Sequence, residues 1–288
     1  MTLRPEMIVA SVPPDQDVVL GDKEFARIAR LVHDIAGIVL PDNKRPLVHS
    51  RLLRRLRVLS LADFAAYADF LSVDGGEAER RELISAVTTN VTSFFREQHH
   101  FDTLSKKVLP DLLAKARRGG RVRLWSAGCS TGEEPYSIAA TILAGLPDAN
   151  RYDIRILATD IDQSVVERTC AARYPADSAR GVPADYARRM FHEDANEGMV
   201  HISDAVRSLV SCKIMNLQEK WPLKGPFDVI FCRNVVIYFD KATQERLWQR
   251  FASLISPGGY LMIGHSERVT GAALADFEPD GITTYQRR

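Results

Sequence analysis

The sequence has 288 residues, of which 45% are hydrophobic and 26% are charged, and its formal net charge is +1 at pH 7. These values are those of an ordinary water-soluble protein that buries a full core and has room for two domains. Because the net charge is close to zero, strong sequence-independent binding to nucleic acid or to an anionic membrane is not expected.

Cysteine spacing and hydropathy restrict the possible classes of protein further. The four cysteines, Cys129, Cys170, Cys212 and Cys232, show no C-x-x-C spacing, so we expect neither a disulfide framework nor a metal site. No stretch approaches the roughly 18 apolar residues of a membrane helix, and no signal-peptide pattern opens the chain. We therefore expect a cytoplasmic protein without membrane insertion.

The first part of the chain has the periodicity of helices. From Asp22 to about Leu83, apolar residues recur at helical spacing and strand-like runs are nearly absent. The repeating residues are Phe25, Ile28, Ala29, Val32, Ile35, Phe64, Tyr67, Phe70 and Leu71. We predict a small all-helical domain over residues 1–85, followed by a linker and a connecting helix over residues 86–120.

One predicted helix of this domain, from Lys44 to Leu59, has both an apolar and a basic face. Its apolar face consists of Leu52, Leu56 and Leu59. Its basic residues are Lys44, Arg51 and Arg55, with Arg54 beside them. A solvated helix face is the simpler interpretation of such a stripe. A docking surface for an acidic partner is the alternative.

Beyond Arg121 the pattern changes to strands that alternate with helices. Short apolar runs predict strands at residues 122–126, 154–159, 227–232, 260–264 and 283–286, and helices at 134–143, from 164, and at 241–255. This alternation predicts an α/β domain over residues 121–288, built on a mostly parallel, doubly wound sheet. The final strand is expected to pair antiparallel at one edge.

Residues 174–213 interrupt the alternation. A turn-rich run at 175–181 is followed by a short helical piece at 184–190 and by two strand-like runs at 198–202 and 206–213. The pattern predicts an inserted β subdomain that includes a hairpin joined by Ser203 to Ala205. Insertions at this edge of such sheets often determine substrate choice.

The bend after the first predicted strand has an unusual charge. Gly128 and Gly132 permit a ligand to approach the backbone closely, but Glu133 and Glu134 follow directly. In a phosphate-binding loop, carboxylates at these positions would repel the phosphate. Favourable interaction with the helix dipole is the simpler explanation for at least one of them. The other explanation is that one carboxylate meets a cationic ligand. S-adenosylmethionine, which combines an adenosine, a sulfonium and an ammonium group, is such a ligand.

Polar residues also follow the later strands. Asp160 is placed to accept hydrogen bonds from ribose hydroxyls, and Asn216 is followed by Leu217 where an amide can contact an adenine edge. The run from Arg233 to Tyr238 follows the next strand. Each residue alone is often a turn or cap residue, but their occurrence at successive strand ends predicts one pocket.

A further polar run, residues 88–96, lies before the sheet and ends in two aromatics and a cation. A helix-capping turn between domains explains Thr88 to Ser93. The simpler interpretation of Arg96 is a surface salt bridge to Glu97 or Asp102. The simpler interpretation of Tyr238 is a half-buried aromatic side chain.

Four motifs together resemble one known family. They are Thr88–Glu97 (TTNVTSFFRE), Trp125–Ser137 (WSAGCSTGEEPYS), Ala158–Asp162 (ATDID) and Phe231–Asp240 (FCRNVVIYFD). In this order they closely resemble the CheR family of chemotaxis receptor methyltransferases, and the resemblance covers nearly the whole chain. It implies a Rossmann-like S-adenosylmethionine-dependent methyltransferase domain with a small inserted antiparallel β subdomain, preceded by an all-α domain.

The resemblance also implies roles for single residues. The cofactor would be surrounded by Asn90, Thr92, Arg96, Glu133, Asp160, Asn216, Leu217, Arg233 and Asn234. Arg96 and Tyr238 would border the methyl group and an incoming glutamate side chain. The implied reaction is protein-glutamate O-methylation, with S-adenosylhomocysteine as the second product. A glutamate carboxylate is already ionised at neutral pH, so we expect catalysis by placement without a general base.

The implied partner is the acidic helical bundle of methyl-accepting chemotaxis receptors, which favours docking on Lys44, Arg51, Arg54 and Arg55. The segment Phe191–Gly198 is shorter than the loop of relatives that bind a C-terminal receptor pentapeptide, so we expect docking without this tether. We expect a monomer. A nicotinamide-dependent oxidoreductase is the first alternative, although G-x-G-x-x-G is missing, and a non-catalytic cofactor-binding module is the second.

Overall fold

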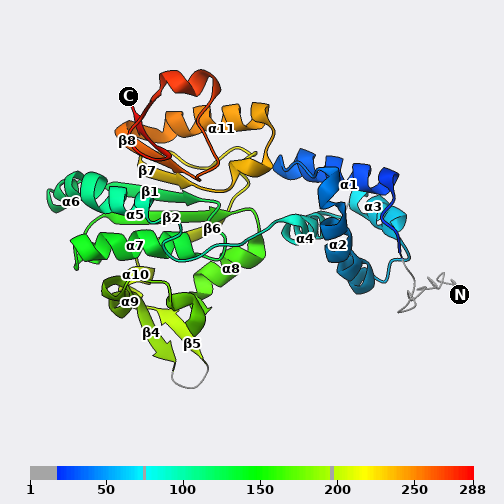
Figure 1. Ribbon diagram of the computed structural model, residues 1–288, viewed down its shortest axis with the longest axis horizontal. Helices are drawn as coiled ribbons and strands as arrows, with labels where there is room; N and C mark the ends of the chain where they lie inside the picture. The colour runs from blue at the N-terminus through cyan, green and yellow to red at the C-terminus, as the bar shows by residue number, and fades with distance from the viewer. Residues whose placement is uncertain (1–17, 74–75, 195–197) are drawn as a thin grey trace, which may run out of the picture. The chain divides into compact units, whose positions relative to one another are not determined.

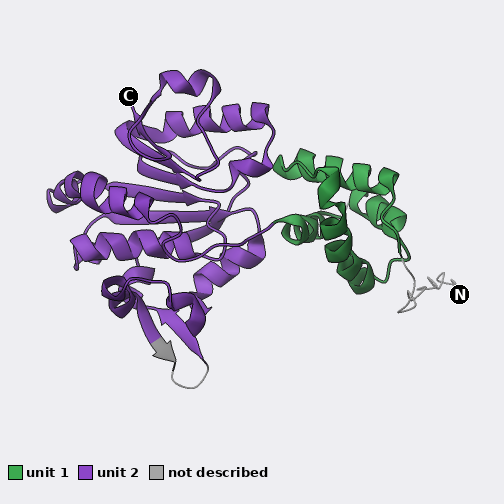
Figure 2. Cartoon of the chain, in the orientation of Figure 1, with its two compact units in different colours: residues 1–88 green, residues 89–288 purple. Residues whose placement is uncertain are grey.

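The computed structural model describes residues 18–73, 76–194 and 198–288, and the chain forms two compact units, residues 1–88 and residues 89–288 (Figure 2). Each unit is described by itself. Within the described residues, no helix is both long enough and apolar enough to cross a membrane.

The first unit is all-helical, as predicted. Its elements are α1 (Asp22–Ala36), η1 (Asp42–Lys44), α2 (Arg45–Leu59), α3 (Phe64–Ser72) and α4 (Glu77–Val87). Helix α1 ends where Gly37 adopts φ 71°, a left-handed conformation that glycine enters without steric cost. Helix α3 begins at the cap residue Asp63, whose carboxylate accepts a hydrogen bond from Ala66 N at 2.8 Å.

A buried acid holds three helices of this unit together. Glu79 of α4 is only 5% exposed, and its carboxylate accepts hydrogen bonds from Arg55 Nε and Nη2 of α2 at 2.9 and 2.6 Å. Tyr67 of α3 donates a third, at 2.8 Å. Because the guanidinium is bidentate and the carboxylate is nearly dry, Arg55 is a structural residue of this unit.

The other cations of the predicted basic stripe have different surroundings. Arg51 donates hydrogen bonds to Ala86 O and Thr88 O, at 3.1 and 2.6 Å, and thereby satisfies carbonyls at the end of α4. Lys44 belongs to η1, outside α2, and both Lys44 and Arg54 are exposed. Lys44 and Arg54 are therefore the two candidate docking cations whose side chains remain accessible.

The second unit begins with helical segments that precede its sheet. These are α5 (His99–Thr103), the π-helical turn η2 (Leu104–Val108) and α6 (Leu109–Arg117). Phe101, Leu104 and Leu113 from this stretch are buried in the core under the sheet. The expected connecting helix is therefore an integral layer of the α/β unit.

A seven-stranded sheet forms the centre of the second unit (Figure 1). Its order is β6-β2-β1-β7-β8-β10-β9. The bounds are β1 (Val122–Ala127), β2 (Ile154–Asp160), β6 (Val210–Ile214), β7 (Phe227–Cys232), β8 (Ile255–Ile263), β9 (Phe277–Pro279) and β10 (Thr284–Arg287). The first five in this sheet order are parallel, and β10 pairs antiparallel with both β8 and β9. The last strand is therefore inside the sheet, and β9 forms the edge.

Two apolar cores cover the two faces of the sheet. Successive strand residues point to opposite faces, so Leu124 lies in the core beneath α7 (Glu133–Gly145), whereas Trp125 lies in the core beneath α11 (Lys241–Leu254). The remaining long helix, α8 (Gln163–Ala171), packs on β2 and β6. The strand order reverses between β1 and β7, where a doubly wound sheet opens a crevice at its carboxyl edge.

The insertion contains a second, three-stranded antiparallel sheet, but one predicted connection is wrong. The strand order is β3-β5-β4, and the strands are β3 (Arg173–Pro175), β4 (Phe191–Asp194) and β5 (Met199–Ile202). Between β3 and β4 the chain forms the helices η4 (Ala176–Ala179) and α9 (Ala184–Met190). The hairpin is formed by β4 and β5, and residues 195–197 of its loop lie outside the described residues. Ser203 to Ala205 instead lead into the helical turn α10 (Asp204–Arg207). The chain then enters β6, because the apolar run pairs with β2 of the main sheet.

Removing the Arg55 side chain tests the stability of the helical unit. We expect Arg55→Ala to lower the free energy of unfolding by about 3 kcal/mol, because it leaves the Glu79 charge buried with Tyr67 as its remaining donor. Arg54→Ala, an exposed change on the same helix, should stay within about 0.5 kcal/mol of wild type. Urea unfolding curves measure both, and equal curves for the two variants would contradict a structural role for Arg55.

Candidate functional site

The glycine bend after β1 is shaped by close contacts with two other segments. Gly128 has φ 86°, and a Cβ atom there would overlap the side chain of Val235 in the loop after β7. The N–H groups of Gly128 and Cys129 donate to Thr159 O at the end of β2, at 2.8 and 2.9 Å. The bend thus joins the carboxyl ends of three strands, as their parallel arrangement predicts.

Asp160, the last residue of β2, is oriented by backbone donors. Its carboxylate accepts hydrogen bonds from Ser130 N at 2.8 Å and from Asp162 N at 3.1 Å, and the residue is 9% exposed. Burial raises the pKa of Asp160, and these N–H groups oppose the rise because they favour the ionised form. The result is a fixed acceptor beside the glycine bend, in the position predicted for a ribose contact.

Asn90 bonds to residues on both sides of this loop system, at Asp162 and at Ser130. Its amide donates to Asp162 Oδ2 at 2.8 Å, and its carbonyl accepts from Ser130 Oγ at 2.9 Å. Asp162 also caps α8 through Ser164 N. Asn90 therefore connects its segment to the bend after β1, and Thr92 in the same segment is half-buried.

The two acids at the start of α7 have different roles. Glu134 accepts a hydrogen bond from Ser126 Oγ at 2.7 Å and pairs with Arg233 Nη1 at 3.1 Å. Glu133 is 8% exposed and accepts from Thr131 Oγ1 at 2.6 Å, and within the described part of the chain it forms no ion pair. Burial raises the pKa of both carboxyls. Glu133 is consequently the carboxylate that remains for a cationic ligand.

The loop after β6 is adjacent to Asp160. Met215 N donates to Asp160 O at 2.8 Å, which brings Asn216 and Leu217 to the same edge. The Asn216 amide shapes this loop, since its Oδ1 accepts from Gln218 N and its Nδ2 donates to Glu219. Leu217 is buried, at 7% exposure.

Arg233, predicted as a cofactor contact, has its guanidinium surrounded by protein groups. The side chain is 2% exposed and lies 3.1 Å from Glu134 Oε2 and 3.4 Å from Glu97 Oε2. It also donates to the backbone carbonyl of Arg96. Its visible role is thus to join the end of β7, the start of α7 and the 94–97 segment.

Arg96 itself is held between two strained residues. Phe95 and Glu97 have φ of 54° and 57°, the left-handed region that non-glycine residues rarely adopt. Phe95 N donates to Ser137 Oγ of α7 at 3.0 Å, which fixes one side of the turn. The Arg96 side chain is half-buried and donates one N–H to Val91 O at 3.0 Å. Such local strain is characteristic of functional segments.

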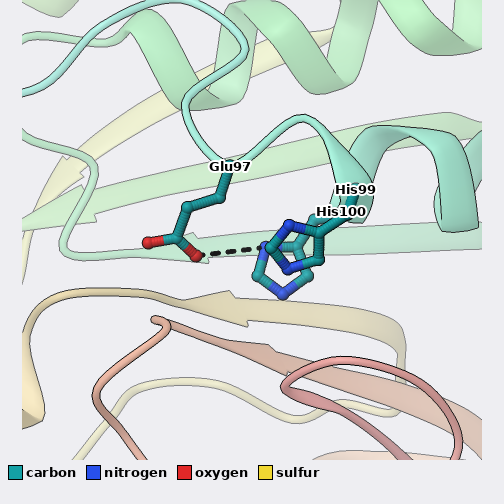
Figure 3. Close-up of side chains that lie close together, drawn as sticks. All are labelled: Glu97, His99 and His100. Carbon is teal, nitrogen blue, oxygen red and sulfur yellow. Dashed lines mark ion pairs between the residues drawn. The ribbon is translucent and has the colours of Figure 1, made fainter.

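Glu97 forms a compact cluster with two histidines (Figure 3). Burial opposes its charge, but His265 and Arg233 outweigh this and lower the pKa of Glu97 to about 2. His100 is fully buried, and burial together with Arg233 lowers its pKa to about 3, so it is neutral at physiological pH. Potential ligand atoms of Glu97, His99 and His100 lie within 4.8 Å of one another. The adjacent Arg233 guanidinium would repel a metal cation at this cluster. Glu97 is the counter-charge of Arg233.

The loop after β7 places Asn234 and Tyr238 at the same edge. Asn234 has φ 58°, and its amide donates to Glu97 Oε1 at 3.4 Å. Tyr238 ends the turn η5 (Val236–Tyr238) and is half-buried. Its hydroxyl has no hydrogen-bond partner among the described residues, so this donor remains available.

Several members of this edge were not among the predicted site residues. Glu97, Glu134, Asp162, His265 and Glu267 all bond to segments that carry predicted site residues. Glu267 follows β8 in the run Gly264–Glu267, so the rule applied to the other strand ends would also have found it. His265 and Glu97 gave no such signal, because their partners are distant in sequence.

These residues fit S-adenosylmethionine by the chemistry of their donors and acceptors. The bend cannot accommodate a side chain at Gly128, and Asp160 is a fixed acceptor beside it. Glu133 is an acid that forms no ion pair with any described residue. A ligand with ribose hydroxyls and a cationic amino-acid portion matches this set, whereas a pyrophosphate would face Glu133.

Comparison with known families and proteins agrees with this chemistry. Residues 90–285 match the family described as CheR methyltransferase, SAM binding domain, and residues 23–88 match CheR methyltransferase, all-alpha domain. A probable chemotaxis protein methyltransferase of Rhizobium etli is 48% identical over 258 residues, covering 89% of this chain and 96% of the relative. The chemotaxis protein methyltransferase of Salmonella typhimurium is 42% identical over 274 residues, covering 94% and 92%. With a helical first unit and a doubly wound second unit that both match, the chain belongs to the CheR methyltransferase family.

Proposed function

We propose that this chain transfers a methyl group from S-adenosylmethionine to glutamate side chains of methyl-accepting chemotaxis receptors. The products are glutamyl methyl esters and S-adenosylhomocysteine. The main supporting observation is that the bend after β1 brings together Asp160 and the buried acid Glu133 at one sheet edge, in a chain whose relatives are named chemotaxis methyltransferases.

The cofactor is proposed to lie along this edge. Asp160 accepts from the ribose, Glu133 faces the cationic portion, and the loop at Asn216 and Leu217 borders the adenine. Asn90, Thr92, Arg96, Arg233 and Asn234 complete the proposed cofactor site. When bound, S-adenosylmethionine supplies a methyl group on a positively charged sulfur, which a carboxylate oxygen can attack.

The protein's task in this reaction is placement. The acceptor glutamate, with a normal pKa of about 4.3, is ionised at neutral pH and needs no base. Tyr238 offers as a donor a hydroxyl that bonds to none of the described residues, and Arg96 retains guanidinium N–H groups beyond the one bound to Val91 O. A tight Arg–carboxylate pair would also stabilise the ground state, so we propose an orienting role for Arg96, on the acceptor or on the cofactor carboxylate.

Radiolabelled methyl donor, incubated with receptor-rich membranes, tests the reaction. We expect base-labile label on receptor glutamates, at equal rates for receptors with and without the C-terminal pentapeptide. Tyr238→Phe should lower kcat by about 10- to 100-fold, the value of one hydrogen bond to a charged group, with donor Kd within about twofold. Tyr285→Phe, a half-buried tyrosine of β10, is the matched control and should retain full activity. Wild-type kcat in Tyr238→Phe would remove the tyrosine from the mechanism.

The same assay distinguishes a role of Arg96 on the acceptor from a role on the cofactor carboxylate. We expect Arg96→Ala to lower kcat at saturating donor, because the acceptor loses an orienting charge. If Arg96→Ala weakens donor binding alone and turnover at saturation is intact, its role is confined to the cofactor.

The rate should have one decline with pH, on the acid side, where carboxyl groups take up protons. Glu97, with its pKa lowered to about 2, stays ionised and His100, with its pKa lowered to about 3, stays neutral from pH 5 to 9. The acceptor glutamate gains a proton as pH falls toward about 4.3. Burial raises the pKa of Glu133 and of Asp160, so their protonation adds to the loss of rate on the acid side. Initial rates with excess donor should be level from about pH 6 to 9 and decline below pH 5. A bell-shaped profile centred near pH 7 would instead indicate a general base.

Receptor docking is proposed to use the exposed cations of the first unit. Arg54→Glu should raise the receptor KM about fivefold and reduce its salt dependence, because an acidic bundle loses an attractive partner. Arg30→Glu, an exposed reversal on α1, is the control for general charge effects. Equal receptor KM values for these two variants would argue against docking through α2.

A further inference from the structure

Glu267 is a buried acid to which none of the proposed catalytic or binding roles applies. It is 3% exposed, and its carboxylate accepts four backbone hydrogen bonds. Gly264 N and Asn234 N donate to Oε2 at 2.6 and 3.1 Å. Val235 N and Val236 N donate to Oε1 at 2.9 and 3.0 Å. All lone-pair directions of the carboxylate are therefore directed at N–H groups.

Three of these donors are consecutive residues of the loop after β7. Successive N–H groups that converge on one point form a concave anion site, and here the anion is a side chain of the same unit. Burial raises the pKa of Glu267, and the four N–H groups oppose the rise because they bind the ionised form. If the Glu267 carboxylate were removed, the backbone N–H groups of Asn234, Val235 and Val236 would have no hydrogen-bond acceptor. The loop would then have to change its conformation.

Glycine makes this arrangement possible on both sides of the loop. A Cβ at Gly264 would lie 2.7 Å from Asn234 N and 2.9 Å from Glu267 Oε2, so a side chain there would separate the two loops. On the other side, Val235 occupies the space that a Cβ at Gly128 would need. The segment from Asn234 to Val236 is thus held between Glu267 and the glycine bend.

The held segment leads directly to Tyr238. Val236 begins the turn η5, and Tyr238 N donates to Val235 O at 3.2 Å, so the tyrosine's backbone is tied to a residue that Glu267 binds. Any shift of the 234–236 amides would move the Tyr238 hydroxyl, which has no bond of its own among the described residues.

We propose that Glu267 is a positioning residue for methyl transfer, which fixes the 234–236 turn and thereby the place of the Tyr238 hydroxyl. This inference rests on the proposed role of Tyr238 at the acceptor carboxylate. Glu267 contacts neither substrate in this scheme and acts only through the loop that it holds.

A double-mutant cycle tests the coupling. In Glu267→Gln the amide NH₂ would face N–H donors, so at least one backbone bond is lost. We expect kcat to fall about 10- to 100-fold, as in Tyr238→Phe, because a hydroxyl misplaced by about 1 Å no longer orients the acceptor. In the Tyr238→Phe background the same change should cost less than about threefold, because the group to be positioned is already absent. A purely structural role would lower activity equally in both backgrounds.

Two further variants provide controls. Glu278→Gln removes an exposed carboxylate on β9 and should keep wild-type kcat and donor Kd. Glu267→Asp retains the charge but is shorter by one methylene, so its kcat should lie between wild type and Glu267→Gln. If Glu267→Gln fails to fold by circular dichroism, the cycle is run with Glu267→Asp.

The outcomes separate this inference from the proposed function. Receptor methylation by wild type together with additive effects in the cycle overturns the positioning role alone. Wild-type kcat in Glu267→Gln overturns it as well. Absence of labelled receptor glutamates in wild-type reactions overturns the proposed reaction and, with it, the role of Glu267. Non-additivity beyond about tenfold supports the inference.

Discussion

The charge of Arg233 is buried at the carboxyl edge of the sheet, and the surrounding structure is arranged to neutralise it. A guanidinium that is 2% exposed loses nearly all its hydration, so acids must lie beside it. Glu134 and Glu97 supply that charge from α7 and from the 94–97 segment, and the Arg96 carbonyl accepts a further hydrogen bond. One buried cation therefore joins three segments that carry predicted site residues. Removing either acid would leave the buried guanidinium with one carboxylate partner instead of two, so the three segments depend on one another.

A second constraint is that irregular loops, not strands, present the site. Loops at a sheet edge hold their conformation only if their N–H groups find acceptors. Here those acceptors are carboxylates: Asp160 binds the bend after β1, and Glu267 binds the loop after β7. Glycine at 128 and 264 lets the loops approach without side chains between them. The same physical device, a buried acid over backbone amides, thus shapes both sides of the proposed methyl-transfer site.

Much of the fold follows from local pattern. The helical period before residue 85 and the alternation after residue 121 predicted the two classes of unit, because burial of one helix face or of both strand faces dictates which positions are apolar. Strand-end residues such as Asp160 and Asn234 were also predictable, since parallel strands bring their carboxyl ends to one edge. The connection at Ser203 to Ala205 was not, because the apolar run after it fits a hairpin and a sheet strand equally, and only pairing with β2 decides between them.

The sequence by itself determined the classes of the two units, the alternation of strands and helices outside the insertion, and the polar motifs at successive strand ends. These features depend on periodicity and on neighbours in the chain. Only the tertiary structure decided the partners of the charged groups. Arg55 could have faced solvent, yet it binds buried Glu79 of α4. The position of Glu267 after a strand places it at this edge, but neither Glu97 nor Glu267 shows its partners in the sequence, and in the structure they bind Arg233 and the loop before Tyr238. A charged side chain has no periodicity that reveals its partner, and the cost of burying it is met by groups that are distant in sequence.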